Sequence, residues 1–197
     1  MTEKQLKKLV DTAVIGVLKN LGFDEKGNRV NSPSARHPRS NMHHPFPPFY
    51  NTDSKIHILG SFPSVASRMG GFYYHHPHNR FWKVLSTLTH SSLPNTIEEK
   101  KDLLSKHKIA LWDVIEQCSI KGSSDASIHD VKASDIQTLL QQSSIERIFA
   151  NGKAAGKLYE KWCEPFTCKS ITTLPSTSPA NAAYDMQRLL TLWSVIL

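Results

Sequence analysis

The chain has few cysteines and no long apolar segment. Its three cysteines, Cys118, Cys163 and Cys168, form no Cys-x-x-Cys pair, which argues against a disulfide framework and a cysteine-rich zinc or iron–sulfur site. No apolar run reaches the roughly 18 residues of a transmembrane helix, and the N-terminus lacks the layout of a secretory signal. We therefore expect a protein that is not secreted and does not span a membrane, and that works in the cytoplasm of a prokaryote or the nucleus of a eukaryote.

Acidic residues are absent from residues 54–97, although this stretch holds Lys55, Arg68, Arg80 and Lys83 and five histidines. The whole chain carries a formal net charge of +7. A surface built from this segment would attract phosphates, so nucleic acid is the first partner class expected and an anionic membrane the second. A soluble basic protein with neither partner is the alternative on charge alone.

Strand and helix patterns alternate along most of the chain. Apolar or β-branched runs predict strands, and apolar residues at helical spacing predict helices. The predicted strands are 56–60, 109–112, 145–150 and 170–174, and the predicted helices are 3–22, 79–88, 97–107, 131–141, 153–162 and 180–195. This alternation indicates an α/β fold, a parallel sheet covered by helices on both faces. Residues 24–53, rich in Pro, Ser, Asn, His and Arg, read as a loop.

Ligands of such sheets bind beyond the carboxyl ends of the strands. Here those ends lead into residues 61–67, 113–117, 151–152 and 175–181. In the first of these segments a glycine and a proline favour a sharp turn, whose free N–H groups can hold an anion or a base carbonyl. Ser64 and Ser67 could add phosphate contacts there. A purely structural turn is the alternative.

Several motifs, taken together and in order, resemble the hypoxanthine-DNA glycosylase family, a branch of the uracil-DNA glycosylase superfamily. They are His44–Pro48, Ile58–Arg68, Gly71–Trp82, Ala110–Ile115, Phe149–Ala155 and Leu174–Asn181. The resemblance covers about residues 44–197, and leaves 1–43 as an N-terminal amphipathic helix with a basic linker. It implies a three-layer α/β/α sandwich around a four-stranded parallel sheet, with DNA as the partner. We expect a monomer without a cofactor.

The resemblance places the catalytic residue at Asn79. Superfamily relatives usually carry a catalytic Asp or Asn in a Gly-x-Asp/Asn-Pro turn, where this chain has Phe62. The related branch instead uses the Asn of a His-Pro-x-Asn element, which is Asn79 here. An amide can orient water but accepts protons poorly, so we expect Asn79 to position water at C1′ of the sugar. The alternative is that Asn79 caps the helix starting at Arg80.

A flipped base needs a stacking partner and hydrogen bonds to its edge. By its distance from the first turn, Tyr74 is the expected stacking ring, and we expect at least one of Phe72, Tyr73 and Tyr74 to belong to the core. Asp113 ends the second strand, where relatives read the base edge, and could accept the N–H of hypoxanthine or uracil. A capping box of Asp113 and Glu116 at a helix start is the alternative. The expected base-binding set is Gly60, Ser61, Phe62, Tyr74 and Asp113.

The segment 175–181 resembles the superfamily loop that enters the minor groove. Many relatives carry His-Pro-Ser-Pro there, and Leu174 stands at the His position, so a neutral His that stabilises the leaving group is absent. Serine hydroxyls can hold phosphates, and Ala180 or Asn181 could fill the gap left in the base stack. A Ser/Pro surface turn is the alternative. The expected DNA contacts are Ser64, Ser67, Arg68, His76, Arg80, Ser176, Ser178 and Asn181.

Two further chemistries are disfavoured. His75, His76 and His78 could bind zinc, but no acidic residue lies near them in sequence, so we expect no metal and place His76 near the sugar or phosphate. No lysine is clearly placed to form a Schiff base with an abasic sugar. We therefore expect a monofunctional glycosylase that releases hypoxanthine, with uracil as a possible second substrate.

Two other functions stay open at this point. Phe62 and Leu174 replace residues that relatives use in catalysis, which would also fit a non-catalytic DNA-binding module with the same fold. The predicted helix at 3–22 could dock on a membrane surface or a partner independently of the catalytic domain.

Overall fold

A four-stranded parallel sheet forms the centre of the fold, with strands in the order β3-β2-β6-β7. The computed structural model describes residues 40–197, so the predicted helix at 3–22 lies outside the described residues. The strands are β2 (Ile56–Gly60), β3 (Ile109–Asp113), β6 (Arg147–Asn151) and β7 (Thr172–Leu174). The predicted parallel sheet is confirmed, because each predicted strand contributes one of these four.

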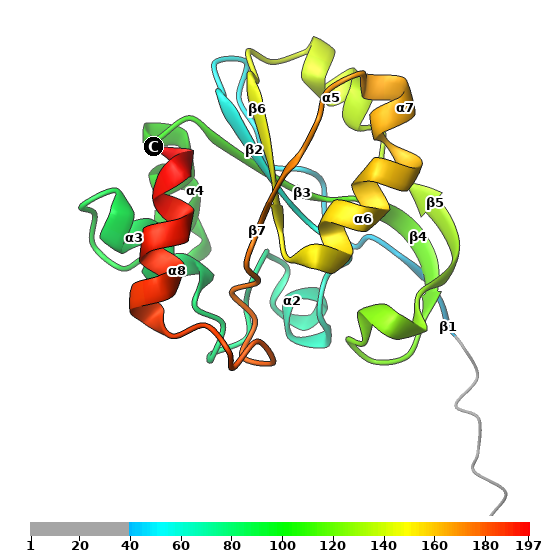
Figure 1. Cartoon of the computed structure of the whole chain (residues 1–197), viewed down its shortest axis with the longest axis horizontal. Coiled ribbons are helices and arrows are strands. Elements are labelled where there is room, and N and C mark those ends of the chain that lie inside the picture. The colour runs from blue at the N-terminus through cyan, green and yellow to red at the C-terminus, as the bar shows by residue number, and fades with distance from the viewer. Residues whose placement is uncertain (1–39) are drawn as a thin grey trace, which may run out of the picture. The chain divides into compact units, whose positions relative to one another are not determined.

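Helices cover both faces of this sheet (Figure 1). On one side lie α3 (Phe81–Leu88), α4 (Ile97–Lys106) and α8 (Met186–Trp193), and on the other lie α5 (Ile136–Gln141), α6 (Lys153–Trp162) and α7 (Glu164–Thr167). Successive residues of a strand point to opposite faces. Accordingly Ile58 packs in the core beneath α3, α4 and α8, whereas Leu59 packs in the core beneath α5 and α6. The three-layer α/β/α sandwich is thereby confirmed.

The helix boundaries follow local capping. The Thr96 side chain accepts the Glu99 N–H and Glu99 reaches back to the Thr96 N–H, which fixes the start of α4. Helix α6 matches its predicted bounds. The predicted helix at 180–195 begins only at Met186, because the Asp185 side chain accepts the Arg188 N–H and ends the preceding loop.

A second, antiparallel sheet was not predicted. It has three strands in the order β1-β4-β5, which are β1 (Ser40–His43), β4 (Ile115–Ile120) and β5 (His129–Ala133). Strand β1 lies inside the segment read as a loop, so that prediction is wrong for residues 40–43. The predicted helix at 131–141 is wrong over its first residues, which belong to β5, and α5 begins only after Asp135 caps it through the Thr138 N–H.

The alternative for Asp113, a capping box at a helix start, is ruled out because β4 follows β3 directly. Backbone N–H groups of Val114 and Ile115 donate to the carbonyl oxygens of Gly60 and Ser61, which carries the chain from β3 directly into β4. Asp113 therefore does not cap a helix, and its side chain is available for another contact.

The remaining short turns of helix are α2 (Val65–Gly70), η1 (Asp125–Ser127) and η2 (Ser194–Ile196). No helix within residues 40–197 is long and apolar enough to cross a membrane.

Candidate active site

A cavity of about 150 Å³ lies at the carboxyl ends of β2, β3 and β6, where Gly60, Asp113 and Asn151 end these strands. Figure 1 shows α2 and the segment between β7 and α8 at the same end of the sheet. This is the position that the parallel topology predicts for a ligand. The cavity is lined by Gly60, Ser61, Phe62, Pro63, Ser64, Ser67, Tyr73, Tyr74, Asn79, Asp113, Ser123, Asp125, Asn151, Ser176 and Ser178.

Asn79, predicted as the catalytic residue, lines this cavity just before α3. Its Oδ1 accepts two hydrogen bonds, from the Phe81 N–H at 3.0 Å and from the Thr177 hydroxyl at 2.9 Å. The bond to Phe81 makes a tight turn just before α3, but the N-cap of this helix is Arg80, which makes no side-chain cap hydrogen bond, so Asn79 is not the N-cap that the alternative named. Since a carbonyl oxygen has two lone pairs, Oδ1 is fully used and the orientation of the amide is fixed.

The contacts of Thr177 extend this arrangement to a third segment. Thr177 is fully buried, and its hydroxyl accepts from Asn151 Nδ2 at 2.9 Å while its N–H donates to Asn151 Oδ1 at 2.9 Å. The ends of β6, the 175–185 loop and the start of α3 are thus joined by one hydrogen-bonded chain. Among residues 40–197, Asn79 Nδ2 has no hydrogen-bond partner in the protein, which leaves two donors for a molecule in the cavity.

Asp113 is buried at the end of β3 and pairs with His44. Its Oδ2 lies 2.9 Å from His44 Nε2, and His44 Nδ1 lies 2.6 Å from the carbonyl oxygen of Phe46. Because that carbonyl can only accept, Nδ1 carries a proton. The other carboxylate oxygen, Oδ1, is the atom that a Cβ on Gly60 would meet at 2.1 Å. Only glycine at position 60 therefore leaves room for this carboxylate at the cavity wall.

Tyr74 presents a buried hydroxyl that has no hydrogen-bond partner within the described residues. A Cβ on Gly60 would lie 3.4 Å from this hydroxyl, so it shares the neighbourhood of Asp113. Burial, aided by the Asp113 charge, raises the pKa of Tyr74 above its ordinary value, and the nearby Asn151 side chain opposes the rise without meeting hydrogen-bond geometry; the hydroxyl therefore remains a donor. One face of the Tyr74 ring stacks on Phe81, with ring centroids 3.8 Å apart, so only its other face could take a base.

The other aromatic residues divide as follows. Phe72 and Tyr73 are core residues, which confirms that at least one of the three consecutive rings belongs to the core. Phe62, at the usual catalytic position of the superfamily, is nearly buried and lines the cavity. The Arg68 guanidinium lies 5.8 Å from the centre of the Phe62 ring and donates to the carbonyls of Pro63 and Gly122.

A second carboxylate, Asp125, reaches the cavity from the turn η1. Its Oδ1 accepts the Ser61 hydroxyl at 2.6 Å. Asp125 is exposed as a residue, but desolvation of its carboxyl beside the cavity raises the pKa of Asp125, the Ser61 hydrogen bond opposes the rise, and the charge of Asp113 adds to it. Ser64 caps α2 by accepting the Ser67 N–H, and the Ser67 hydroxyl accepts the His75 N–H.

The 175–185 loop is held by Arg80. Its guanidinium donates to the carbonyls of Thr177, Tyr184, Ser178 and Asn181. These contacts are internal, so Arg80 shapes the loop, and its predicted contact with DNA is a separate matter that stays a prediction. The loop also binds itself, because Asn181 Nδ2 donates to the Ser176 carbonyl at 2.9 Å. Ala180 is exposed.

The structure brings together most of the predicted site. Every residue predicted to bind the base lines the cavity, as do Asn79 and the serines Ser64, Ser67, Ser176 and Ser178. Four predicted DNA contacts do not line it, namely Arg68, His76, Arg80 and Asn181. Sequence reasoning missed the roles of His44, Asp125, Asn151 and Thr177. The motif around His44 was visible, but its pairing with Asp113 across 69 positions was not.

Known proteins match both the sequence and the fold. The family model described as the uracil DNA glycosylase superfamily matches residues 47–195. A hypoxanthine DNA glycosylase from Methanosarcina acetivorans is 34% identical over 145 residues, which are 73% of this chain and 90% of that protein. Another, from Methanosarcina barkeri, is 31% identical over 114 residues, 57% of this chain and 72% of that protein. The solution NMR structure of a proposed uracil DNA glycosylase from M. acetivorans superimposes with a TM-score of 0.67 at 29% identity, covering 80% of this chain and 95% of that one.

Proposed function

The chain belongs to the uracil-DNA glycosylase superfamily and is a DNA glycosylase, and on this premise we propose that it hydrolyses the N-glycosidic bond of a deaminated base and leaves an abasic site. Hypoxanthine is the first substrate, since the two curated relatives carry that name, and uracil is the second. The observation that carries the proposal is the orientation of Asn79, whose amide is locked at Oδ1 and offers Nδ2 to the cavity.

Asn79 positions the attacking water. Cleavage passes through an oxocarbenium-like sugar, so the water needs alignment below C1′ more than it needs a strong base. Because both lone pairs of Oδ1 are occupied, Asn79 holds the water oxygen through Nδ2–H and takes no proton from it. The C1′–N bond breaks, the base departs with the bonding electron pair, and the water oxygen bonds to C1′ of the sugar cation; the proton that this water then loses passes through solvent to the departed base. No lysine lines the cavity among the described residues, which supports hydrolysis without a lyase step.

Asp113 and Tyr74 read the base edge. Asp113 Oδ1 is an acceptor and the unpartnered Tyr74 hydroxyl is a donor, and both lie beside Gly60. Hypoxanthine and uracil present an N–H beside a carbonyl, which matches an acceptor beside a donor. Adenine and cytosine present the reverse pattern on the corresponding atoms, a ring nitrogen acceptor beside an amino group. The pair therefore favours the deaminated base over its parent, because binding of the parent base would leave buried polar groups without hydrogen bonds.

The surrounding loops hold the DNA. Backbone amides near Gly60 and Ser61 stabilise the departing base, and the serines of the 61–67 and 175–181 segments contact phosphates on either side of the flipped nucleotide. The protein acts on duplex DNA as a monomer, without a metal or cofactor.

Base release under single-turnover conditions tests the proposal. A labelled duplex bearing deoxyinosine or deoxyuridine is incubated with the protein and treated with alkali, which breaks the strand at an abasic site. We expect cleavage with alkali and an intact strand without it. Asn79→Ala should lower the rate about a hundredfold, because the water is no longer aligned, and should bind the duplex as before.

Asn95→Ala is the matched control, because Asn95 is an exposed asparagine before α4, and its rate should equal that of the wild type. If neither lesion strand breaks, the proposed enzymatic function fails. Lesion-dependent binding that Asn79→Ala leaves unchanged, without base release, would instead identify a non-catalytic DNA-binding module.

A further inference from the structure

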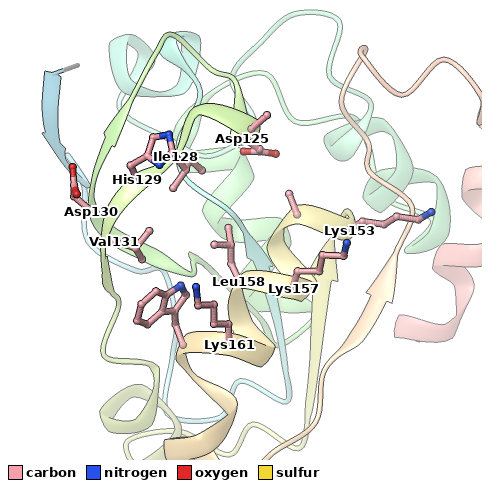
Figure 2. Close-up of a pocket in the computed structure, with 12 residues that line it drawn as sticks. Asp125, Ile128, His129, Asp130, Val131, Lys153, Lys157, Leu158 and Lys161 are labelled. Atoms are coloured by element: carbon pink, nitrogen blue, oxygen red, sulfur yellow. The ribbon is translucent and has the colours of Figure 1, made fainter. Parts of the chain in front are cut away.

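A second hollow, of about 830 Å³, lies between β5 and α6 (Figure 2). Val131 of β5 and Leu158 of α6 point toward each other across it. Half-buried apolar side chains form its floor, and they are Ile128, Val131, Ala154, Leu158 and Trp162. We refer to this hollow as the β5–α6 groove. The groove contains the ring of Trp162 and enough apolar surface to hold flat groups away from water.

Three exposed lysines line the α6 side of the groove, namely Lys153, Lys157 and Lys161. A spacing of four residues places them on one face of the helix, about 6 Å apart along its axis. The Lys161 ammonium lies 4.6 Å from the centre of the Trp162 ring, so cation and ring stand together at the far end of the row. The α6 wall therefore carries a line of positive charge beside an apolar floor.

The groove adjoins the active-site cavity. Asp125 lines both, and Lys153 follows two residues after Asn151, which lines the cavity. Asp125 and Asp130 are the acidic residues of the opposite wall, and Asp125 is already bonded to Ser61 at the cavity. From Lys153 the row of lysines runs along α6 away from the cavity, so a strand leaving the cavity on this side would meet the lysines in succession.

We propose that the β5–α6 groove binds a single-stranded DNA segment beside the lesion duplex, where unpaired DNA adjoins the duplex that holds the target nucleotide, with phosphates along the lysines and unpaired bases on the apolar floor. Grooves for single strands combine a line of cations with surfaces on which bases stack. A duplex keeps its bases stacked internally and would leave the apolar floor unused. An acidic amphipathic peptide would match the same chemistry, but its binding would not explain why the groove adjoins the cavity at Asp125. The inference rests on the proposed function only for the placing of the target nucleotide.

Binding of an undamaged oligonucleotide tests the groove separately from base release. Fluorescence anisotropy with a labelled twenty-nucleotide thymidine strand is measured for the full chain across a range of salt concentrations. Each phosphate contact on a single strand contributes about 0.7 to the slope of log K against log salt. In Lys157→Ala/Lys161→Ala, which removes two such contacts, we therefore expect the slope to become shallower by about 1.4. The same change in slope, taken from 1 M down to 0.1 M salt, corresponds to an affinity about 25-fold lower at 0.1 M salt.

The matched control is Lys101→Ala/Lys106→Ala, which removes the same charge from exposed positions on α4, across the sheet. It should change affinity and slope much less. A loss in the groove variant no greater than in this control overturns the proposal. So does a result in which the groove variant weakens binding of a labelled Glu/Leu amphipathic peptide and not of the oligonucleotide.

The two failures can be told apart. Base release from a blunt-ended lesion duplex is measured for the same variants, and Lys157→Ala/Lys161→Ala should keep the wild-type rate there. If neither the wild type nor any variant releases base, but Lys157→Ala/Lys161→Ala still binds the oligonucleotide more weakly than the control variant does, the proposed function fails and the groove remains supported. If base release holds while the oligonucleotide result is absent, only the groove is overturned.

Discussion

His57 offers a quantitative test of the packing around β2. It is the second residue of this strand, is fully buried, and has no hydrogen-bond partner at either ring nitrogen among the described residues. Desolvation by burial lowers the pKa of His57 from 6.5 to about 3. The folded protein therefore keeps a neutral imidazole at pH values where the unfolded chain takes up a proton. As the pH falls below 6.5, protonation of His57 therefore stabilises the unfolded state and not the folded state, and the free energy of unfolding decreases.

His57→Leu removes both effects while keeping a similar volume. Two unpaired buried nitrogens each cost about 1–3 kcal/mol, and imperfect repacking offsets part of the gain, so we expect the variant to be about 1–2 kcal/mol more stable at pH 7. Proton uptake by His57 in the unfolded wild type is small at pH 7 and stabilises the unfolded state by about 2 kcal/mol at pH 5. The advantage of the variant should therefore grow by about 2 kcal/mol between these pH values.

Urea unfolding at pH 7 and pH 5, followed by circular dichroism, measures this difference. Ile148→Leu is the control, because Ile148 lies opposite His57 in β6 and carries no titratable group, so its stability difference from wild type should be the same at both pH values. If the wild type and His57→Leu lose equal amounts of stability between pH 7 and pH 5, the inference that His57 stays neutral in the folded protein is wrong.

Two further predictions concern the positioning of active-site groups. Thr177→Val removes one of the two donors to Asn79 Oδ1, so we expect the single-turnover rate to fall about tenfold, equivalent to one hydrogen bond, with substrate Kd unchanged; an unaltered rate in the folded variant would remove Thr177 from the positioning chain. Gly60→Ala would place a Cβ 2.1 Å from Asp113 Oδ1, so displacement of that carboxylate should reduce release of hypoxanthine at least tenfold while binding of undamaged duplex persists. Retention of full activity by Gly60→Ala would argue against Asp113 as the reader of the base edge.

The central sheet was predictable because its strands carry a direct signal. A parallel strand covered on both faces reads as a continuous apolar run, as in Ile56–Gly60, where every residue is buried. The second sheet lacks that signal. Strand β5 at its edge is mostly exposed, and its sequence His-Asp-Val-Lys-Ala holds few apolar residues. In β4 the buried positions Ile115, Cys118, Ser119 and Ile120 do not alternate, so the pattern did not distinguish a strand from a helix.

The cavity was predictable in its location and in most of its lining residues, but not in its contacts, and the roles of these residues stay predictions. Strand ends and the family resemblance placed Asn79, Tyr74 and Asp113 together. The partner of Asn79, Thr177, lies 98 residues away, and a single sequence contains no information on such a pair. Arg80 is a second example of contacts that a single sequence does not reveal. Its charge suggested a phosphate contact, which stays a prediction, but nothing in the sequence indicated that its guanidinium holds the carbonyls of the 175–185 loop.

The pairing of Asp113 with His44 answers an electrostatic objection to a carboxylate in this site. A free carboxylate would repel the negative charge that the base gains as it leaves. Here His44 Nδ1 must donate to the Phe46 carbonyl, and Nε2 faces Asp113 Oδ2. For both contacts to be hydrogen bonds, either the imidazole carries its second proton or the carboxyl does, and in each case the pair is neutral as a whole. In its proposed role, Asp113 thereby keeps an acceptor for the base N–H without adding net charge beside the departing base.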